Sequence, residues 1–162
     1  MDQETHERFL GLLDSSRAAV LIVADWLCGK GMNVMLPYYS RSPDHQVRSQ
    51  HRDGGDIMAL NKDISKAYRI EVRHHQNESW TGPGDWPERN VYGAIVGPLH
   101  CHNDKTYAWF HLNKDMTHYY MVKPGSRAHW STRAVMDKPS GEKKDNYFVP
   151  IEHVEFGRFS DE

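Results

Sequence analysis

The sequence has little cysteine, no long hydrophobic run and almost no net charge. Its two cysteines, Cys28 and Cys101, lack the close, regular spacing of a disulfide-stapled secreted domain. The longest apolar run, residues 18–27, is too short to span a bilayer and contains Asp25. The first residues are acidic, whereas a signal peptide begins with basic and then apolar residues. We therefore expect a cytoplasmic protein in a reducing compartment, without a membrane-spanning segment.

Neither sign of charge dominates, because the formal net charge is only -2 at pH 7. Any affinity for nucleic acid must therefore come from local clusters of Lys and Arg. Hydrophobic residues make up 38% and charged residues 26% of the 162 residues, which is typical of a globular chain. At this length we expect a single domain, residues 1–162, with one core.

The pattern of apolar residues predicts a helix followed mostly by strands. Apolar positions at steps of three and four indicate a helix from Glu4 to about Lys30. The segments "DIMAL" and "YRIEVR" predict an antiparallel hairpin, and "TYAWFHL" and "HYYMVK" predict a second one. The apolar run Val91 to Gly97 predicts a central strand buried on both faces. The expected fold is α+β, an N-terminal helix followed by a central mixed β-sheet, with no internal repeat.

Asp56 and Glu71 are the candidate metal ligands. If the first hairpin pairs antiparallel, Asp56 at the start of one strand comes close to Glu71 on the other. Arg73 shares a face with Glu71, because strand side chains alternate. Two carboxylates are hard oxygen ligands that suit Mg²⁺ or Mn²⁺ together with a substrate phosphate. The pattern therefore favours metal-assisted hydrolysis of a phosphodiester bond.

This arrangement resembles the PD-(D/E)XK nuclease superfamily, whose core is a helix followed by a hairpin with Asp on one strand and Glu-x-Lys on the next. The matching residues are Asp56 and Glu71-Val72-Arg73. The resemblance implies a restriction-endonuclease-like fold and a Mg²⁺-dependent endonuclease that acts on DNA, or less expectedly on RNA. It also implies a metal bound at Asp56, Glu71 and Val72. The family's leading helix often adds an acidic ligand, here Glu7 or else Asp14.

The chain departs from the family pattern at Arg73, which stands where the family has lysine. Arginine binds phosphate and stabilises transition-state charge, but its pKa above about 12 prevents it from accepting a proton. We therefore assign Arg73 to phosphate contact. One alternative is a catalytically inactive nuclease fold that binds nucleic acid or a protein partner. A second is an unrelated α+β interaction protein, and a homodimer is left open.

Basic residues gather before Asp56 and between Lys123 and Lys144, two regions where the sequence predicts loops. They indicate a rim that binds phosphates. Tryptophans near these regions would either stack on bases or fill the core; they are Trp80, Trp86 and Trp130. The predicted nucleic-acid contacts are Arg41, Arg48, Arg52, Arg127 and Arg133.

A zinc site is a less favoured interpretation of the histidines. The segment His100-Cys101-His102 precedes His111 and His118, but no second cluster completes four ligands at the usual spacing. We therefore expect surface histidines and a fold that does not depend on zinc.

Replacing Arg48 and Arg52 with alanine should weaken DNA binding and flatten its salt dependence, because each phosphate contact releases condensed counterions. Losing two contacts should reduce the slope of log K against log salt concentration by about 2. Fluorescence anisotropy with a labelled duplex between about 50 and 200 mM salt measures this slope. An unchanged slope would exclude both arginines from the contact surface.

Overall fold

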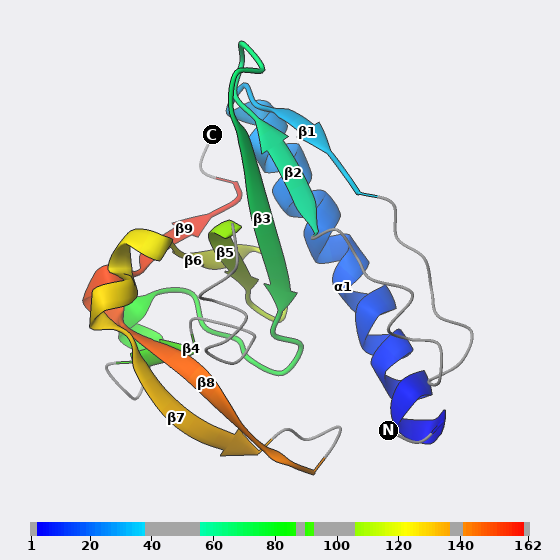
Figure 1. The fold of residues 1–162 in the computed structure, drawn as a ribbon, viewed down its shortest axis with the longest axis vertical. Coiled ribbons are helices and arrows are strands. Elements are labelled where there is room, and N and C mark those ends of the chain that lie inside the picture. The colour runs from blue at the N-terminus through cyan, green and yellow to red at the C-terminus, as the bar shows by residue number, and fades with distance from the viewer. Residues whose placement is uncertain (1–2, 38–55, 87–89, 93–105, 137–140, 161–162) are drawn as a thin grey trace.

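The computed structural model of the chain describes residues 3–37, 56–86, 90–92, 106–136 and 141–160. Within these residues the chain forms one α-helix, α1 (Gln3–Gly29), and nine strands in two sheets (Figure 1). The predicted α+β class, with an N-terminal helix ahead of a mixed sheet, is confirmed. In this part of the chain no helix has a stretch apolar enough to span a bilayer.

The larger sheet has six strands in the order β1-β2-β3-β5-β6-β9. Neighbouring strands are antiparallel except β3 and β5, which run parallel. Both predicted hairpins are confirmed, as β2–β3 and β5–β6. The strands are β1 (Asn33–Met35), β2 (Ile57–Leu60), β3 (Ala67–His74), β5 (Thr106–Leu112), β6 (His118–Val122) and β9 (Glu155–Arg158).

The smaller sheet has three antiparallel strands in the order β4-β8-β7. They are β4 (Asn90–Tyr92), β7 (Ser131–Met136) and β8 (Lys143–Pro150), and short 3-10 helices adjoin them at η2 (Pro83–Asp85), η3 (Pro124–His129) and η4 (Ile151–His153). The predicted loop between Lys123 and Lys144 is therefore wrong, because η3 and β7 occupy much of it. Strand β7 is mostly exposed and is held by backbone pairing with β8, which leaves no hydrophobic pattern to detect.

The prediction of a central strand over Val91–Gly97 is also wrong in its placement. Val91 and Tyr92 belong to β4 at the edge of the smaller sheet, and residues 93–97 lie outside the described residues. The position beside β3 in the larger sheet is taken by β5. An apolar run indicates burial, but it does not identify the strand with which it pairs.

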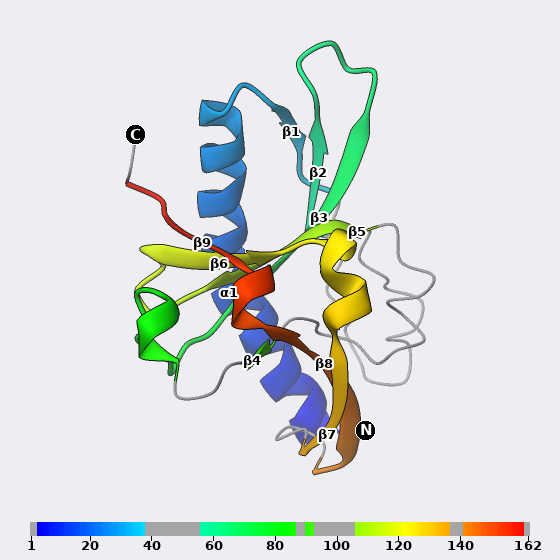
Figure 2. The ribbon, with the colours of Figure 1, turned by 90° about the vertical axis from the view of Figure 1, so that its left-hand side faces the viewer.

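Two hydrophobic clusters cover the two faces of the larger sheet, where the sequence predicted one core. The helix cluster joins α1 to β2, β3 and β5 through Ala19, Val20, Val23, Ala24, Leu27, Ile57, Ala59, Ile70, Val72, Ala108, Phe110 and Leu112. The inter-sheet cluster is formed by Trp80, Trp109, Tyr120, Val122, Tyr147 and Val149. In Figure 1 strand β3 lies between α1 and the strands of the smaller sheet, and Figure 2 gives the view from the side of the smaller sheet. Residues that alternate along β3 therefore face different clusters.

The connecting turns of the two hairpins in the larger sheet have nearly the same sequence. Residues 60–65 read Leu-Asn-Lys-Asp-Ile-Ser and residues 112–117 read Leu-Asn-Lys-Asp-Met-Thr, so the expectation of no internal repeat is wrong. In each turn the fifth residue has a left-handed backbone, with φ 60° at Ile64 and 56° at Met116. The amide of Ile64 donates to the Asn61 carbonyl at 2.9 Å, and that of Met116 donates to the Asn113 carbonyl at 3.0 Å.

Replacing Asn113 with alanine should destabilise the fold by about 2 to 4 kcal/mol, because buried partners lose their hydrogen bonds. The Asn113 amide donates to the Trp80 carbonyl at 3.0 Å, and its oxygen accepts from the amides of Thr117 and His118. The equivalent Asn61→Ala should cost only about 1 kcal/mol, because that turn is exposed. Urea unfolding of both variants measures the difference, and equal losses would contradict this account.

Candidate functional site

Asp56 lies at the open end of the β2–β3 hairpin, against the part of β3 that carries Glu71, Val72 and Arg73. Ile57 pairs with Ile70 in the antiparallel register, and Asp56 directly precedes Ile57 at the end of β2. The Asp56 Oδ2 atom accepts a hydrogen bond of 2.6 Å from the backbone amide of Val72. The Asp56 carboxylate is thus held against β3 at Val72, the residue between Glu71 and Arg73.

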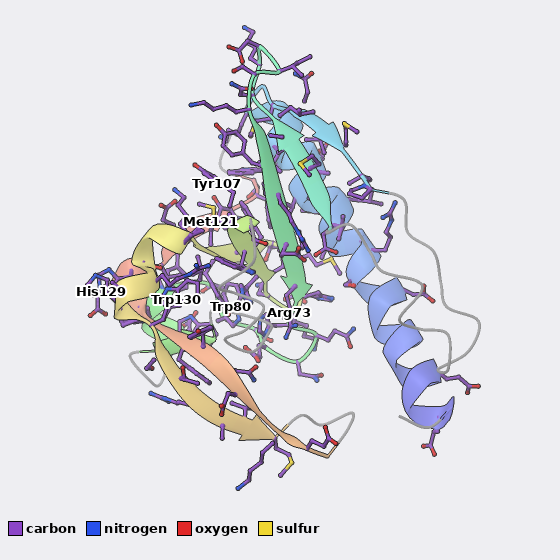
Figure 3. All side chains as sticks on the ribbon, in the orientation of Figure 1. Arg73, Trp80, Tyr107, Met121, His129 and Trp130 are labelled. Carbon is purple, nitrogen blue, oxygen red and sulfur yellow. The ribbon has the colours of Figure 1, made fainter. Side chains whose placement is uncertain are left out.

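Glu71 and Arg73 lie on the face of the larger sheet opposite α1. The neighbouring Ile70 and Val72 belong to the helix cluster, so strand alternation directs Glu71 and Arg73 to the other side. In the parallel register Glu71 lies beside Trp109. Figure 3 shows Arg73 at the carboxyl end of β3. The face of the sheet that carries these charges is therefore also the face that packs against the inter-sheet cluster.

Val72 can contribute to a metal only through its backbone carbonyl, because its side chain has no donor atom and packs in the helix cluster. In a strand the N–H and C=O of one residue point to the same neighbour. Since the Val72 amide points to Asp56, the Val72 carbonyl lies on the Asp56 side of β3 as well. The Val72 carbonyl must point to this side if it is to bind the same metal ion as Asp56.

The Glu71 carboxylate is paired with Arg69, which is the kind of ion pair expected if Arg69, Glu71 and Arg73 only form a charged face of the hairpin. The Glu71 Oε1 atom lies 2.6 Å from Arg69 Nη2 and 2.7 Å from Arg69 Nε. The side chains are 19% and 35% exposed, so the pair is only partly screened by water. The sequence allows this pair to be predicted, because side chains two residues apart in a strand, such as Arg69 and Glu71, lie on the same face. Any cation that binds Glu71 must share it with Arg69 or displace Arg69.

The donor chemistry at the hairpin base suits a hard divalent cation. Two carboxylates and a strand carbonyl are oxygen donors, and Mg²⁺ needs only one or two protein carboxylates because it keeps several waters. Within the described residues, however, no three His, Cys, Asp or Glu side chains form a group that could hold a metal ion. Glu7 and Asp14 lie exposed on α1. Through its hydrogen bond from the Val72 amide, Asp56 is an acidic side chain that the structure places directly against the Glu71-Val72-Arg73 segment.

A hydrogen-bonded pair of histidines lies on the same face of the sheet. His111, the register partner of Arg73, is fully buried and stacks on Tyr120 with 4.4 Å between ring centroids. Its Nδ1 atom lies 2.9 Å from His75 Nε2, and His75 Nδ1 lies 3.2 Å from Glu78 Oε1. The expectation that His111 is a surface histidine is wrong, because β5 alternation places it with Trp109 in the space between the sheets. The three side chains form a polar chain from buried β5 to the exposed Glu78.

The structure describes two of the five predicted nucleic-acid contacts. Arg127 lies over the Trp130 ring at 5.6 Å, and Arg133 lies over the Phe148 ring at 4.8 Å. Both arginines thus use the guanidinium plane in contacts with the chain's own aromatic rings. The other predicted residues lie outside the described residues; they are Arg41, Arg48 and Arg52, together with His100, Cys101 and His102 of the zinc interpretation.

The predicted tryptophans are mainly core residues. Trp80 is buried in the inter-sheet cluster, and Trp86 and Trp130 pack against it. Figure 3 shows Trp80 and Trp130 on the side of the smaller sheet. Of the two roles considered for these residues, the structure shows packing.

No known protein family, curated protein or solved structure matches the chain. The resemblance to the PD-(D/E)XK superfamily remains an expectation based on Asp56 and Glu71-Val72-Arg73.

Replacing Arg69 with glutamine should tighten Mn²⁺ binding by about 3- to 10-fold, because the cation that competes for Glu71 is removed. Isothermal titration calorimetry with Mn²⁺ measures the affinity. Lys123→Gln is the matched control, since it removes one positive charge and one ion pair, Lys123 Nζ to Glu155 Oε1 at 2.6 Å, at another place in the larger sheet. Unchanged affinity in Arg69→Gln would show that Arg69 and the metal do not compete.

Proposed function

We propose that this protein is a metal-dependent endonuclease that hydrolyses phosphodiester bonds in DNA at the open end of the β2–β3 hairpin. The supporting observation is the 2.6 Å hydrogen bond from the Val72 amide to Asp56 Oδ2. It holds one carboxylate next to the strand residues that carry a second carboxylate and a cation. This arrangement follows the order of residues in the superfamily that the sequence resembles.

Each side chain has a role that its chemistry permits. Asp56 and Glu71 supply anionic oxygens for Mg²⁺ or Mn²⁺, and Val72 supplies a backbone carbonyl. When bound, such an ion lowers the pKa of a coordinated water and stabilises charge on the phosphate. Arg73 binds a phosphate oxygen and stabilises the negative charge that develops in the transition state. It accepts no proton, so Arg73 is an electrostatic and positioning group rather than a base.

Arg69 links the binding of DNA to the availability of the Glu71 carboxylate for a metal ion. Its guanidinium is paired with the Glu71 carboxylate, but phosphate is an equally suitable bidentate partner for arginine. A DNA phosphate that binds Arg69 would therefore draw it away from Glu71. The carboxylate would then be available to the metal when the substrate is present.

The second candidate is a nuclease-like fold without catalytic activity that binds nucleic acid. The same Arg69–Glu71 pair favours this alternative, because it neutralises one of the two carboxylates. Arg73 in place of lysine favours it as well, since one catalytic option is lost. The two candidates differ in whether a divalent cation binds between Asp56 and Glu71.

Asp56→Asn and Glu71→Gln should each reduce Mg²⁺- or Mn²⁺-dependent DNA cleavage at least about 100-fold, because each removes an anionic ligand with little change in shape. Arg73→Lys should preserve or raise cleavage, since lysine keeps a cation near the phosphate and can also accept a proton. The assay follows cleavage of linear, supercoiled and branched DNA, and of RNA, by all three variants. Asp115→Asn, at an exposed carboxylate in the β5–β6 turn, is the control.

Persistent cleavage by Asp56→Asn and Glu71→Gln would refute the assigned site. If neither the wild type nor Arg73→Lys cleaves, and Mn²⁺ does not raise the melting temperature, the inactive binding fold becomes the better account.

A further inference from the structure

An exposed isoleucine, Ile64, lies at the tip of the β2–β3 hairpin. Its backbone has a conformation that isoleucine rarely adopts. Ile64 is 65% exposed and has φ 60°. A β-branched residue in the left-handed region is an outlier, whereas Gly and Asn enter this region readily. Neither exposure nor backbone geometry within the chain favours isoleucine at this position.

Hydrogen bonds around the tip keep the turn in shape. The Lys66 amide donates to Asn61 Oδ1 at 2.8 Å, and the Ser65 amide and hydroxyl donate to Asp63 Oδ1 at 3.1 and 2.7 Å. These bonds to Ser65 lower the pKa of Asp63, so its carboxylate stays ionised and directed into the turn. The apolar side chain of Ile64 is thus presented by an ordered backbone.

The repeated turn provides an internal comparison. Met116 has the same place in the Leu-Asn-Lys-Asp sequence and the same left-handed backbone, but its side chain packs against the helix cluster. Packing within the chain therefore accounts for an apolar residue in the second turn. Ile64 belongs to neither hydrophobic cluster of the described residues. Its side chain is therefore available to contact another molecule, whereas that of Met116 is not.

The surroundings of Ile64 suit an anionic partner. Lys62 and Lys66 flank it and are exposed, while the nearby Asp63 carboxylate is engaged by Ser65. Figures 1 and 2 show that the β2–β3 connection projects from one end of the molecule. The same hairpin carries Asp56 and Glu71 at its other end. A ligand that runs along the hairpin would contact the lysines, Ile64 and the two carboxylates together.

We propose that Ile64 is a wedge that enters a base step of duplex DNA lying along the β2–β3 hairpin, an inference that rests on the proposed function. Apolar side chains that insert between base pairs unstack and kink duplex DNA. The four residues of β2 span about 14 Å at roughly 3.4 Å each. With one phosphate per 3.4 Å along a strand, the wedge enters about four to five base pairs from the cleaved bond.

Ile64→Asn should raise the melting temperature by about 2 to 6 °C, because asparagine relieves the backbone strain. The same change should weaken duplex binding about tenfold, because the apolar wedge is lost. Ile64→Leu should keep wild-type affinity, since it retains an apolar tip. Met116→Asn, the same substitution at the matching turn position, should lower the melting temperature and leave binding unchanged.

The binding probe is a duplex with 2-aminopurine about four pairs, and in a second duplex about ten pairs, from the mapped cleavage position. Wild type should increase 2-aminopurine fluorescence at the nearer position only, and Ile64→Asn should not. A higher melting temperature with unchanged affinity and fluorescence would overturn the wedge and would indicate a protein pocket as the partner of Ile64. A lower melting temperature would also overturn it, because Ile64 would then be packed within the chain.

Cleavage by wild type separates this test from the proposed function. If wild type cleaves DNA and Asp56→Asn does not, while Ile64→Asn binds as wild type does, only the wedge fails. If wild type neither cleaves nor binds any duplex, the proposed function and the wedge both fail.

Discussion

The double pairing of β3 is the constraint on which the rest of the structure depends. It is antiparallel to β2 on one edge and parallel to β5 on the other. In this arrangement Ile70 and Val72 face α1, so strand alternation directs Glu71 and Arg73 to the opposite face of the sheet. A shift of one residue would place the charges in the helix cluster, so register and site are specified together.

Side-chain contacts at the base of the hairpin add to this register. At the end of β2 the chain no longer pairs by backbone alone, and the Asp56 side chain takes up the Val72 amide at 2.6 Å. Glu71 is paired with Arg69, which lies on the same face of the same strand. The hairpin base therefore holds one carboxylate on a backbone amide and a second carboxylate on a guanidinium. In our proposal a metal binds the two carboxylates and a DNA phosphate binds Arg69.

The parts of the fold that the sequence predicted correctly depend on local patterns. The helical spacing of Val20, Val23 and Leu27 predicted α1, and the alternation in "YRIEVR" predicted β3. The smaller sheet was missed because β7 is exposed and is specified by its pairing with a distant strand. The placement of β5 beside β3 was missed for a related reason. Parallel strands are joined by a long crossover, so no short turn in the sequence indicates that they pair.

The buried residues of the site also depend on contacts that are distant in sequence. His111 is separated from His75 by most of a crossover, so its burial and its 2.9 Å hydrogen bond could not be read from either segment alone. The Leu-Asn-Lys-Asp repeat was visible in the sequence, but its meaning was not. Only the structure shows that Met116 packs inside while Ile64 lies in water.

The central claim is that Asp56 and Glu71 form one cation site, and a crystal of the protein soaked in Mn²⁺ tests it most directly. The account predicts an anomalous peak between the two carboxylates, at about 2.0 to 2.3 Å from an oxygen of each, with Arg69 moved away from Glu71. A saturating soak that shows no peak there, with the Arg69–Glu71 ion pair intact, would contradict it.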